Sequence, residues 1–184
     1  MLPDPLIAKA ISLGLGLMFA VAAWHKLADG AAFRITLLEY QVMPESLVPV
    51  ASRLIPAIEL LLGIAWLAGL ALDGITAVTS AALLGVYAIA IGVNLRRGRV
   101  HFDCGCGFGG RSDNEQYLSG GLVARNLLLV TAALVTLLPS AGRELGGGDY
   151  LTLAACLTAG VLLFGAANQL LANRAAINTW RKAK

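Results

Sequence analysis

Two cysteines separated by one glycine, Cys104-Gly105-Cys106, are the residues of this chain whose types and spacing best fit a chemical role. Thiols this close in sequence form a disulfide only where the backbone between them adopts an unusual conformation, and Gly105 supplies that freedom. A ring this small is strained, and strain raises the reduction potential of a disulfide. The pair therefore predicts a bond that is made and broken in a cycle rather than one kept for stability.

Basic side chains surround the two thiols in the sequence, namely Arg96, Arg97, Arg99, His101 and Arg111. Positive charge favours the thiolate, which is the reactive form of cysteine, whereas the neighbouring Asp103 acts in the opposite direction. Two other interpretations stay open at this point. The pair is either ordinary or structural, or it joins His101 as soft ligands for copper or zinc.

The composition is that of an integral membrane protein. Of the 184 residues, 58% are hydrophobic and only 14% are charged, whereas soluble domains carry about 25% charged residues. The net charge of +3 comes from basic residues at the ends of apolar runs, which is typical of membrane-flanking charge. No basic stripe interleaved with aromatic residues occurs in the sequence, so nucleic-acid binding is not expected.

Five apolar segments are long enough, or nearly so, to cross the hydrocarbon as helices: about 6–27, 54–72, 75–95, 122–138 and 151–171. Backbone polar groups in lipid must be satisfied within the segment, which favours helices. The sequence therefore predicts an all-α, polytopic helical bundle that forms a single membrane domain over residues 1–184. The first segment is expected to be a retained helix rather than a cleaved signal peptide, because no net positive charge precedes it.

Two long loops, 28–53 and 96–121, are predicted to lie on the same face as the carboxyl tail. Apolar residues at helical spacing over 32–40 predict a short helix along the membrane surface, and Pro44 and Pro49 mark the approach to the second span. Twelve of the fourteen basic residues fall on this face, with Lys9 and Arg143 opposite. The positive-inside tendency therefore predicts a cytoplasmic position for the thiols.

Glu59 is the one carboxylate well inside a predicted span. An ionisable group in this position is costly and suggests a functional or structural partner, for which Arg125-Asn126 at the start of the fourth span is the candidate. Such a pair could hold two helices in register. Lys26, in Trp24-His25-Lys26, is interpreted as an interfacial anchor. Cys156 in the fifth segment is expected to pack as a small hydrophobe.

Three segments in this order resemble the MauE/DoxX family of redox-associated membrane proteins. They are Lys26-Leu27-Ala28-Asp29 followed by Phe33, Tyr40 and Pro44; Leu54-Ile55-Pro56-Ala57-Ile58-Glu59 with Gly63; and Asp103-Cys104-Gly105-Cys106-Gly107 with Arg125-Asn126. The resemblance covers about residues 26–126, and the five-span layout agrees over the rest.

The resemblance implies a multi-pass protein of the bacterial inner membrane that assists the maturation of methylamine dehydrogenase, whose small subunit is rich in disulfides. The implied partners are that subunit and MauD, a thioredoxin-like periplasmic protein. In general plan the family is similar to membrane thiol oxidoreductases of the vitamin K epoxide reductase and DsbB kind, which suggests a quinone as cofactor. Those proteins use a Cys-x-x-Cys pair, however, whereas this chain has Cys-x-Cys and no second obvious pair.

The implied periplasmic substrate opposes the position that the basic residues predict for the thiols. Either the charge rule, which is statistical, misleads here because some loop charges serve the site, or the protein passes electrons across the bilayer. We favour the first, which puts the thiols on the periplasmic side. The leading hypothesis is a thiol-disulfide redox protein that uses Cys104 and Cys106, supported by Glu59, Arg125 and Asn126. A non-enzymatic assembly or transport factor, which would tolerate loss of the thiols, and a metal-handling membrane protein are the alternatives.

Overall fold

The computed structural model describes residues 4–70, 74–99 and 118–182, with side chains up to residue 170. Within these ranges the chain is helical and contains no strand. Its elements, in chain order, are α1 (Pro5–Ala28), α2 (Gly30–Tyr40), the short 3-10 helix η1 (Glu45–Leu47), α3 (Val48–Leu67), α4 (Ile75–Arg96), α5 (Gly120–Val135) and α6 (Gly147–Lys182). The predicted all-α helical bundle is confirmed.

Four stretches of the described chain are long and apolar enough to cross a membrane: α1, η1 with α3, α4, and the Gly147–Leu170 part of α6. Helix α5 is apolar too but has only 16 residues. Large aliphatic side chains such as Leu61, Ile89, Leu128 and Leu163 are exposed on the outer faces of these helices. An apolar outer surface of this extent suits a hydrocarbon solvent and not water.

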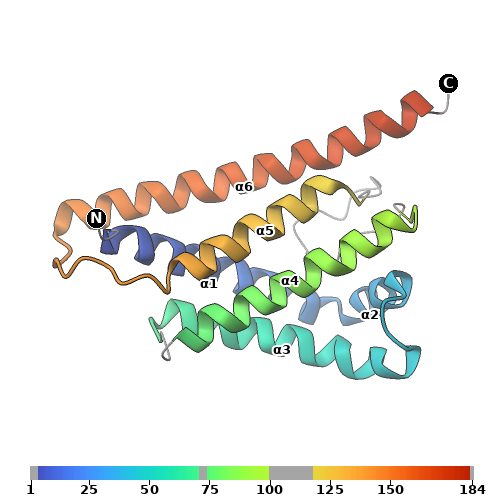
Figure 1. Ribbon diagram of the computed structural model, residues 1–184, viewed down its shortest axis with the longest axis horizontal. Coiled ribbons are helices and arrows are strands. Elements are labelled where there is room, and N and C mark those ends of the chain that lie inside the picture. Colours follow the sequence, from blue (N-terminus) through green and yellow to red (C-terminus); the bar gives the residue numbers. More distant parts are fainter. Residues whose placement is uncertain (1–3, 71–73, 100–117, 183–184) are drawn as a thin grey trace.

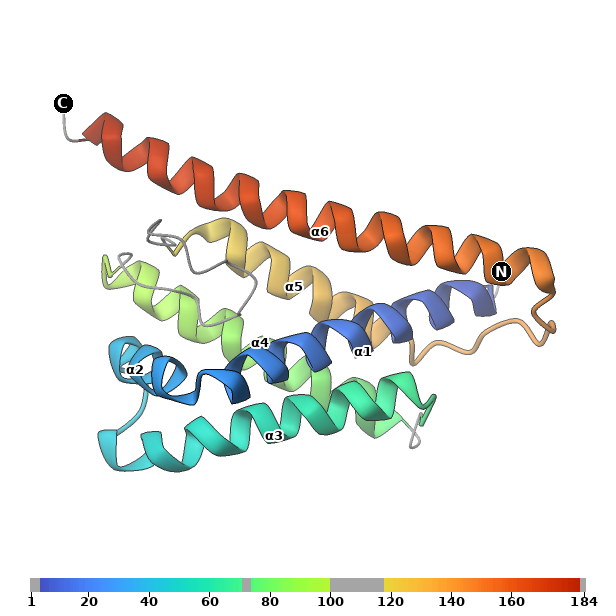
Figure 2. The same ribbon diagram turned by 180° about the vertical axis from the view of Figure 1, so that it is seen from behind.

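The helices run lengthwise beside one another, and α6 lies along the outside of the bundle (Figure 1). Figure 2 shows α2, the end of α4, the start of α5 and the chain's C-terminus gathered at one end of the bundle. The N-terminus lies at the opposite end, where α3 leads into α4 and α5 leads into α6. The 96–121 loop therefore starts and finishes at the α2 end.

The core lies where α1 packs on α3 and α4 packs on α5. Its buried side chains include Leu15, Phe19, Leu62, Trp66 and Leu84. In addition, the buried Trp66 donates a hydrogen bond from Nε1 to Ser80 Oγ at 2.9 Å, which ties α3 to α4. Helix α6 contributes little to this core, because most of its described side chains are exposed.

Glycines allow α1 and α3 to approach closely. A Cβ placed on Gly63 of α3 would lie 2.9 Å from the backbone nitrogen of Ala20 in α1 and 3.2 Å from the carbonyl oxygen of Gly16. Small residues at helix crossings permit this backbone-to-backbone contact in membrane bundles.

Helices α3, α5 and α6 differ from the sequence prediction in their bounds. The C-terminal ends of α3 and α5 lie at Leu67 and Val135 rather than at 72 and 138. Helix α3 begins at Val48 rather than near 54, because Pro49 falls in its first turn, where proline fits a helix without loss of a hydrogen bond. Part of the predicted 28–53 loop is therefore helical, and α2 confirms the helix predicted over 32–40. Helix α6 extends from Gly147 to Lys182, well beyond the predicted 151–171.

At the end of the bundle opposite α2, one arginine links three parts of the chain. Arg143, before α6, donates hydrogen bonds to the carboxylates of Asp4 and Asp149 at 2.8–3.1 Å. Asp4 also caps α1 by accepting from the backbone N–H of Leu6. The hydrogen bonds from Arg143, followed by the one from Leu6, hold the pKa of Asp4 below its usual value.

Candidate functional site: a buried ion pair between the helices

Glu59 of α3 is buried inside the bundle, with 1% of its side chain exposed, and it forms an ion pair with Lys26 of α1. The Nζ of Lys26 donates to Oε1 of Glu59. The same carboxylate oxygen accepts a hydrogen bond from the hydroxyl of Tyr87 in α4 at 2.7 Å. Three helices thus meet at one carboxylate.

Two aromatic rings face the ammonium of Lys26. The ring centroid of Phe33 in α2 lies 5.3 Å from Nζ, and that of Tyr87 lies 5.0 Å away. At these distances the ring faces attract a cation, and the attraction is strongest where water is excluded. Lys26 therefore has its charge balanced by Glu59 and its flanks covered by rings, which explains how a lysine is buried with only 5% of its side chain exposed.

The structure corrects the prediction that Lys26 is an interfacial anchor. Its neighbours Trp24 and His25 are exposed, whereas Lys26 is buried inside the bundle. Successive residues of a helix are about 100° apart, so one of three adjacent polar residues can face inward while the others face out.

Arg125, which the sequence analysis offered as a partner of Glu59, contacts α6 instead. Its Nη1 donates to Oδ1 of Asn168 at 2.8 Å, and its guanidinium lies 5.5 Å from the ring centroid of Phe164. Asn126 is buried and donates to the backbone carbonyl of Leu122 at 2.9 Å. The ion-pair partner that the structure gives Glu59 is Lys26.

Arg125 and Asn126 nevertheless lie near the pair. Both line a small cavity whose other walls include Lys26, Glu59 and Tyr87. The structure thus gathers all three described site residues of the sequence prediction around one polar centre, although Glu59 and Arg125 do not pair there. We refer to Lys26, Glu59 and Tyr87 as the polar cluster.

The polar cluster places two ionisable side chains inside helices of membrane-spanning length. Desolvation of two charges offsets most of their mutual attraction, so a buried ion pair is weak evidence for stability. Ionisable groups inside a membrane segment are rare and mark functional positions by default. The cluster is therefore the described part of this chain with the strongest claim to a functional role.

Both ends of the connection that carries the predicted thiol pair are fixed to α2. On the α4 side, Asn94 donates to the carbonyl of Tyr40 and Arg97 to that of Gln41, each at 3.0 Å. On the α5 side, Leu118 and Leu122 pack with Tyr40 and Ile91. Helix α2 and the residue after it thus contact both described ends of the 96–121 loop.

Three predicted site residues, Cys104, Cys106 and His101, lie outside the described residues. Cys156 is described, and it is a free cysteine exposed on α6 rather than the packed hydrophobe that the sequence analysis expected. Within the described ranges no three His, Cys, Asp or Glu side chains gather as a metal site.

Sequence reasoning missed Tyr87 and Asn168, and it gave Lys26 the wrong role. For Tyr87 and Asn168 a signal was present in the sequence. Tyr87 is the one tyrosine in the apolar run 75–95, and Asn168 is the one asparagine in 151–171. A polar side chain in an apolar helix has to find a partner, but the sequence does not say on which other helix.

Comparison with known proteins gives one consistent family. The family model of the methylamine utilisation protein MauE matches residues 4–139, a range that holds the polar cluster, Arg125 and the cysteine pair. The chain is 37% identical over 168 residues to the methylamine utilization protein MauE of Paracoccus versutus, covering 89% of this chain and 84% of that protein.

Two further relatives bear the same description. The protein of Paracoccus denitrificans is 34% identical over 143 residues, which are 75% of this chain and 73% of its own length. That of Methylophilus methylotrophus is 39% identical over 106 residues, 58% of this chain and 55% of its own length. No solved structure matches the chain.

Proposed function

Because the chain belongs to the MauE family of methylamine utilisation proteins, we propose that it assists the maturation of methylamine dehydrogenase as a thiol-disulfide redox protein of the bacterial inner membrane. Its partners in this proposal are the thioredoxin-like protein MauD and the disulfide-rich small subunit of the dehydrogenase. The observation that carries the proposal is the pair Cys104 and Cys106, which lies within the region that the family model matches.

The chemistry proposed is disulfide exchange. The thiolate of one loop cysteine attacks a disulfide of the partner, which gives a mixed disulfide and releases one partner thiolate. The second loop cysteine then attacks its neighbour's sulfur in the mixed disulfide and releases the second partner thiolate. In sum, two protein thiols are oxidised to one disulfide, the partner's disulfide is reduced to two thiols, and the reverse direction follows the same steps.

The described helices support this proposal through the placement of the loop. The loop that bears Cys104 and Cys106 begins and ends beside α2. Asn94 and Arg97 donate hydrogen bonds to the carbonyls of Tyr40, the last residue of α2, and Gln41, the next residue. A thiol pair must be presented to a docking partner in a reproducible position, since exchange requires three sulfur atoms to meet. Fixed loop ends reduce the number of positions that the thiols sample before they meet the partner's disulfide.

In the proposal, Glu59, Arg125 and Asn126 are supporting residues. Glu59 joins α1 and α3 to α4, the helix that precedes the loop, through Lys26 and Tyr87. Arg125 joins α5, the helix that follows the loop, to α6. These contacts fix the helices that carry the loop, and the thiols supply the chemistry.

The test replaces Cys104 or Cys106 with serine in a methylamine-grown host and traps thiols with an alkylating reagent that adds mass. Loss of the resolving thiol leaves the mixed disulfide unresolved, so one of the two variants is expected to accumulate a covalent adduct with MauD on a non-reducing gel. Both variants are expected to slow disulfide formation in the dehydrogenase small subunit.

Cys156→Ser is the matched control, since it removes a thiol of α6 and leaves the loop pair in place. It is expected to behave as the unaltered protein. Disulfide formation at the normal rate in the small subunit of cells that carry Cys104→Ser or Cys106→Ser would overturn the proposal, and it would favour a non-enzymatic assembly factor.

A further inference from the structure

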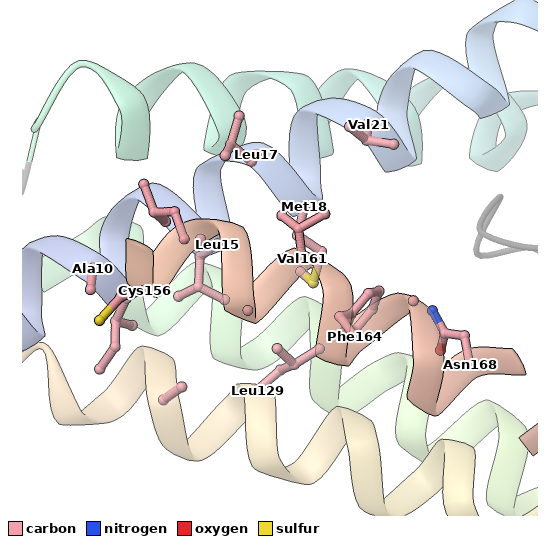
Figure 3. Close-up of a pocket in the computed structure, with 16 residues that line it drawn as sticks. Ala10, Leu15, Leu17, Met18, Val21, Leu129, Cys156, Val161, Phe164 and Asn168 are labelled. Carbon is pink, nitrogen blue, oxygen red and sulfur yellow. The ribbon is translucent and has the colours of Figure 1, made fainter. Parts of the chain in front are cut away.

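The bundle is packed more loosely on its α6 side than around the polar cluster. An apolar groove of about 480 Å³ lies between α1, α5 and α6, and Figure 3 shows Met18 of α1, Leu129 of α5 and Val161 of α6 among its walls. We refer to it as the apolar groove. Of the side chains described on α6, only Leu153 is buried. The position of the helices that carry the thiol loop therefore depends mainly on contacts among α1 to α5.

Four helices meet at the ammonium of Lys26. This residue belongs to α1 and pairs with Glu59 of α3. Its Nζ also lies 5.3 Å from the ring centroid of Phe33 in α2 and 5.0 Å from that of Tyr87 in α4. The ring of Phe33 is buried, with 7% exposed, so its attraction for the cation acts away from water. A single charge therefore acts on α2, α3 and α4 together.

Helix α2 depends on such contacts for its position. It has only 11 residues, and a helix of this length is marginal unless other parts of the protein pack against it. The last carbonyls of a helix have no partner inside it. At and just after the end of α2 these carbonyls accept hydrogen bonds at 3.0–3.4 Å from three side chains at the end of α4 and just beyond it; the donors are Asn94, Arg97 and Arg99. A shift of α2 is therefore passed on to the end of α4, where the thiol loop starts.

The contacts around Lys26 form a closed circuit. On one side, Lys26 contacts Phe33, and α2 leads from Phe33 to the carbonyl that accepts from Asn94. On the other side, Glu59 pairs with Lys26 and accepts a hydrogen bond from Tyr87 of α4. Tyr87 and Asn94 are about two helical turns apart on the same face of α4, which closes the circuit. Each helix in a closed circuit is held at two places, so loss of one contact loosens the whole arrangement.

We propose that Lys26 is a positioning residue for the thiol pair. Its charge holds Phe33 and with it α2, and α2 sets the place from which the loop presents Cys104 and Cys106 to the partner. This inference rests on the proposed function. Lys26 takes no part in the bond changes, which are those of the disulfide exchange given above.

The charge of Lys26 can be separated from its contribution to stability. Lys26→Met together with Glu59→Leu removes both charges and puts apolar side chains of similar size in their place, an exchange that a buried ion pair often tolerates. In this charge-free variant the ring of Phe33 keeps its packing and loses its cation. A defect that remains in a stable charge-free variant therefore reports on positioning.

The experiment measures disulfide exchange by the full chain in phosphatidylcholine nanodiscs, with the loop thiols reduced. Every variant also carries Cys156→Ser, so that only the loop thiols react. Two oxidants are compared: the disulfide of purified MauD, which has to dock, and oxidised glutathione, which does not. We expect Phe33→Leu and the charge-free variant each to slow exchange with MauD about fivefold, the factor that a desolvated cation–π contact is worth. Exchange with glutathione is expected to change by less than about twofold, since a small disulfide reaches the thiols without a docking position.

Phe19→Leu is the matched control. It also shortens a buried aromatic side chain, but Phe19 belongs to the core cluster and its loss leaves the ring that faces Lys26 in place. It is expected to leave exchange with both oxidants unchanged. Phe33→Leu added to the charge-free variant is expected to slow exchange with MauD little further, because the partner charge is already gone.

Hydrogen–deuterium exchange of the α2 amides gives a readout that does not depend on the thiols. These amides are expected to exchange several times faster in Phe33→Leu and in the charge-free variant, and at the normal rate in Phe19→Leu. Unchanged protection of α2 in the first two variants would contradict the proposed hold on this helix.

Three results of the exchange assay overturn the proposal. Equal slowing with MauD and with glutathione would show a general loss of thiol reactivity and no effect on docking. Normal exchange with MauD in Phe33→Leu would rule out this inference and leave the proposed function standing. If the unaltered protein fails to exchange with MauD, the proposed function is wrong and this inference falls with it.

Discussion

Lys26 and Glu59 depend on each other because each is shielded from water by the helices around it. Replacing either one leaves the opposite charge buried and unpaired, at a cost of about 3–5 kcal/mol. We expect Glu59→Leu and Lys26→Met each to lower the free energy of unfolding by about that amount. The measurement is reversible unfolding of the purified protein in mixed micelles, followed by circular dichroism.

The double variant Lys26→Met with Glu59→Leu separates this effect from a loss of packing. A well-packed apolar pair often matches or exceeds a buried ion pair in stability, so most of the loss is expected to return. Glu45→Leu, at an exposed carboxylate near the start of α3, is the control and is expected to change little. Losses in the two single variants that simply add in the double variant would contradict the pairing.

The sequence indicated that Glu59 needs a partner, but it did not identify Lys26 as that partner. Glu59 stands out because a carboxylate inside an apolar run needs compensation. The choice between Lys26 and Arg125 depends on how far each helix is shifted along its neighbour and which way it is turned, and hydropathy carries neither quantity. Lys26 also lies near the end of its helix, where lysine is common, so the sequence did not indicate that this side chain is buried.

Among the elements, the closest packing is between α1 and α3. An added Cβ at Gly63 would lie 2.9 Å from a backbone nitrogen of α1, and a backbone atom cannot move aside as a side chain can. We therefore expect Gly63→Ala to lower the free energy of unfolding by about 1–3 kcal/mol, the usual cost of overpacking.

Gly85 of α4 provides the matched control for Gly63. A Cβ added there meets nothing within 4 Å, so only the helix preference of alanine acts, and Gly85→Ala is expected to be neutral or to stabilise by up to about 1 kcal/mol. The measurement is the same unfolding curve. Equal effects of the two substitutions would show that α1 and α3 do not approach through Gly63.

The helical type of the elements could be read from hydropathy, but η1 and several bounds could not. Apolar runs of spanning length predict helices because lipid offers the backbone no other partner. Helix α3 starts before the predicted apolar run because the first turn of a helix tolerates a proline, here Pro49. Helix α6 continues past residue 171, where the apolar run ends. Proline and loss of hydropathy mark the end of a membrane run more reliably than the end of a helix.

In the molecule as a whole, polar side chains gather between the helices and large apolar side chains cover the outer faces. The polar cluster lies between the helices, the 96–121 loop starts and ends beside α2, and the apolar groove flanks α6. The separation arises because charged groups in lipid must face the bundle interior, whereas the outer surface must be hydrocarbon. Composition alone predicted the membrane setting, but the groove depends on how loosely α6 packs, which composition does not report.

The side of the membrane that carries the thiol loop decides whether Cys104 and Cys106 can meet a periplasmic partner. The basic residues of that end favour the cytoplasm, whereas exchange with a periplasmic partner requires the opposite side. Since the proposed function needs the thiols to meet MauD, we expect a membrane-impermeant maleimide to modify Cys104 and Cys106 in intact spheroplasts after mild reduction. Cys156→Ser serves as background, so that all modification reports on the loop. Modification that appears only after the membrane is permeabilised would place the thiols in the cytoplasm and separate this chain from a periplasmic exchange partner.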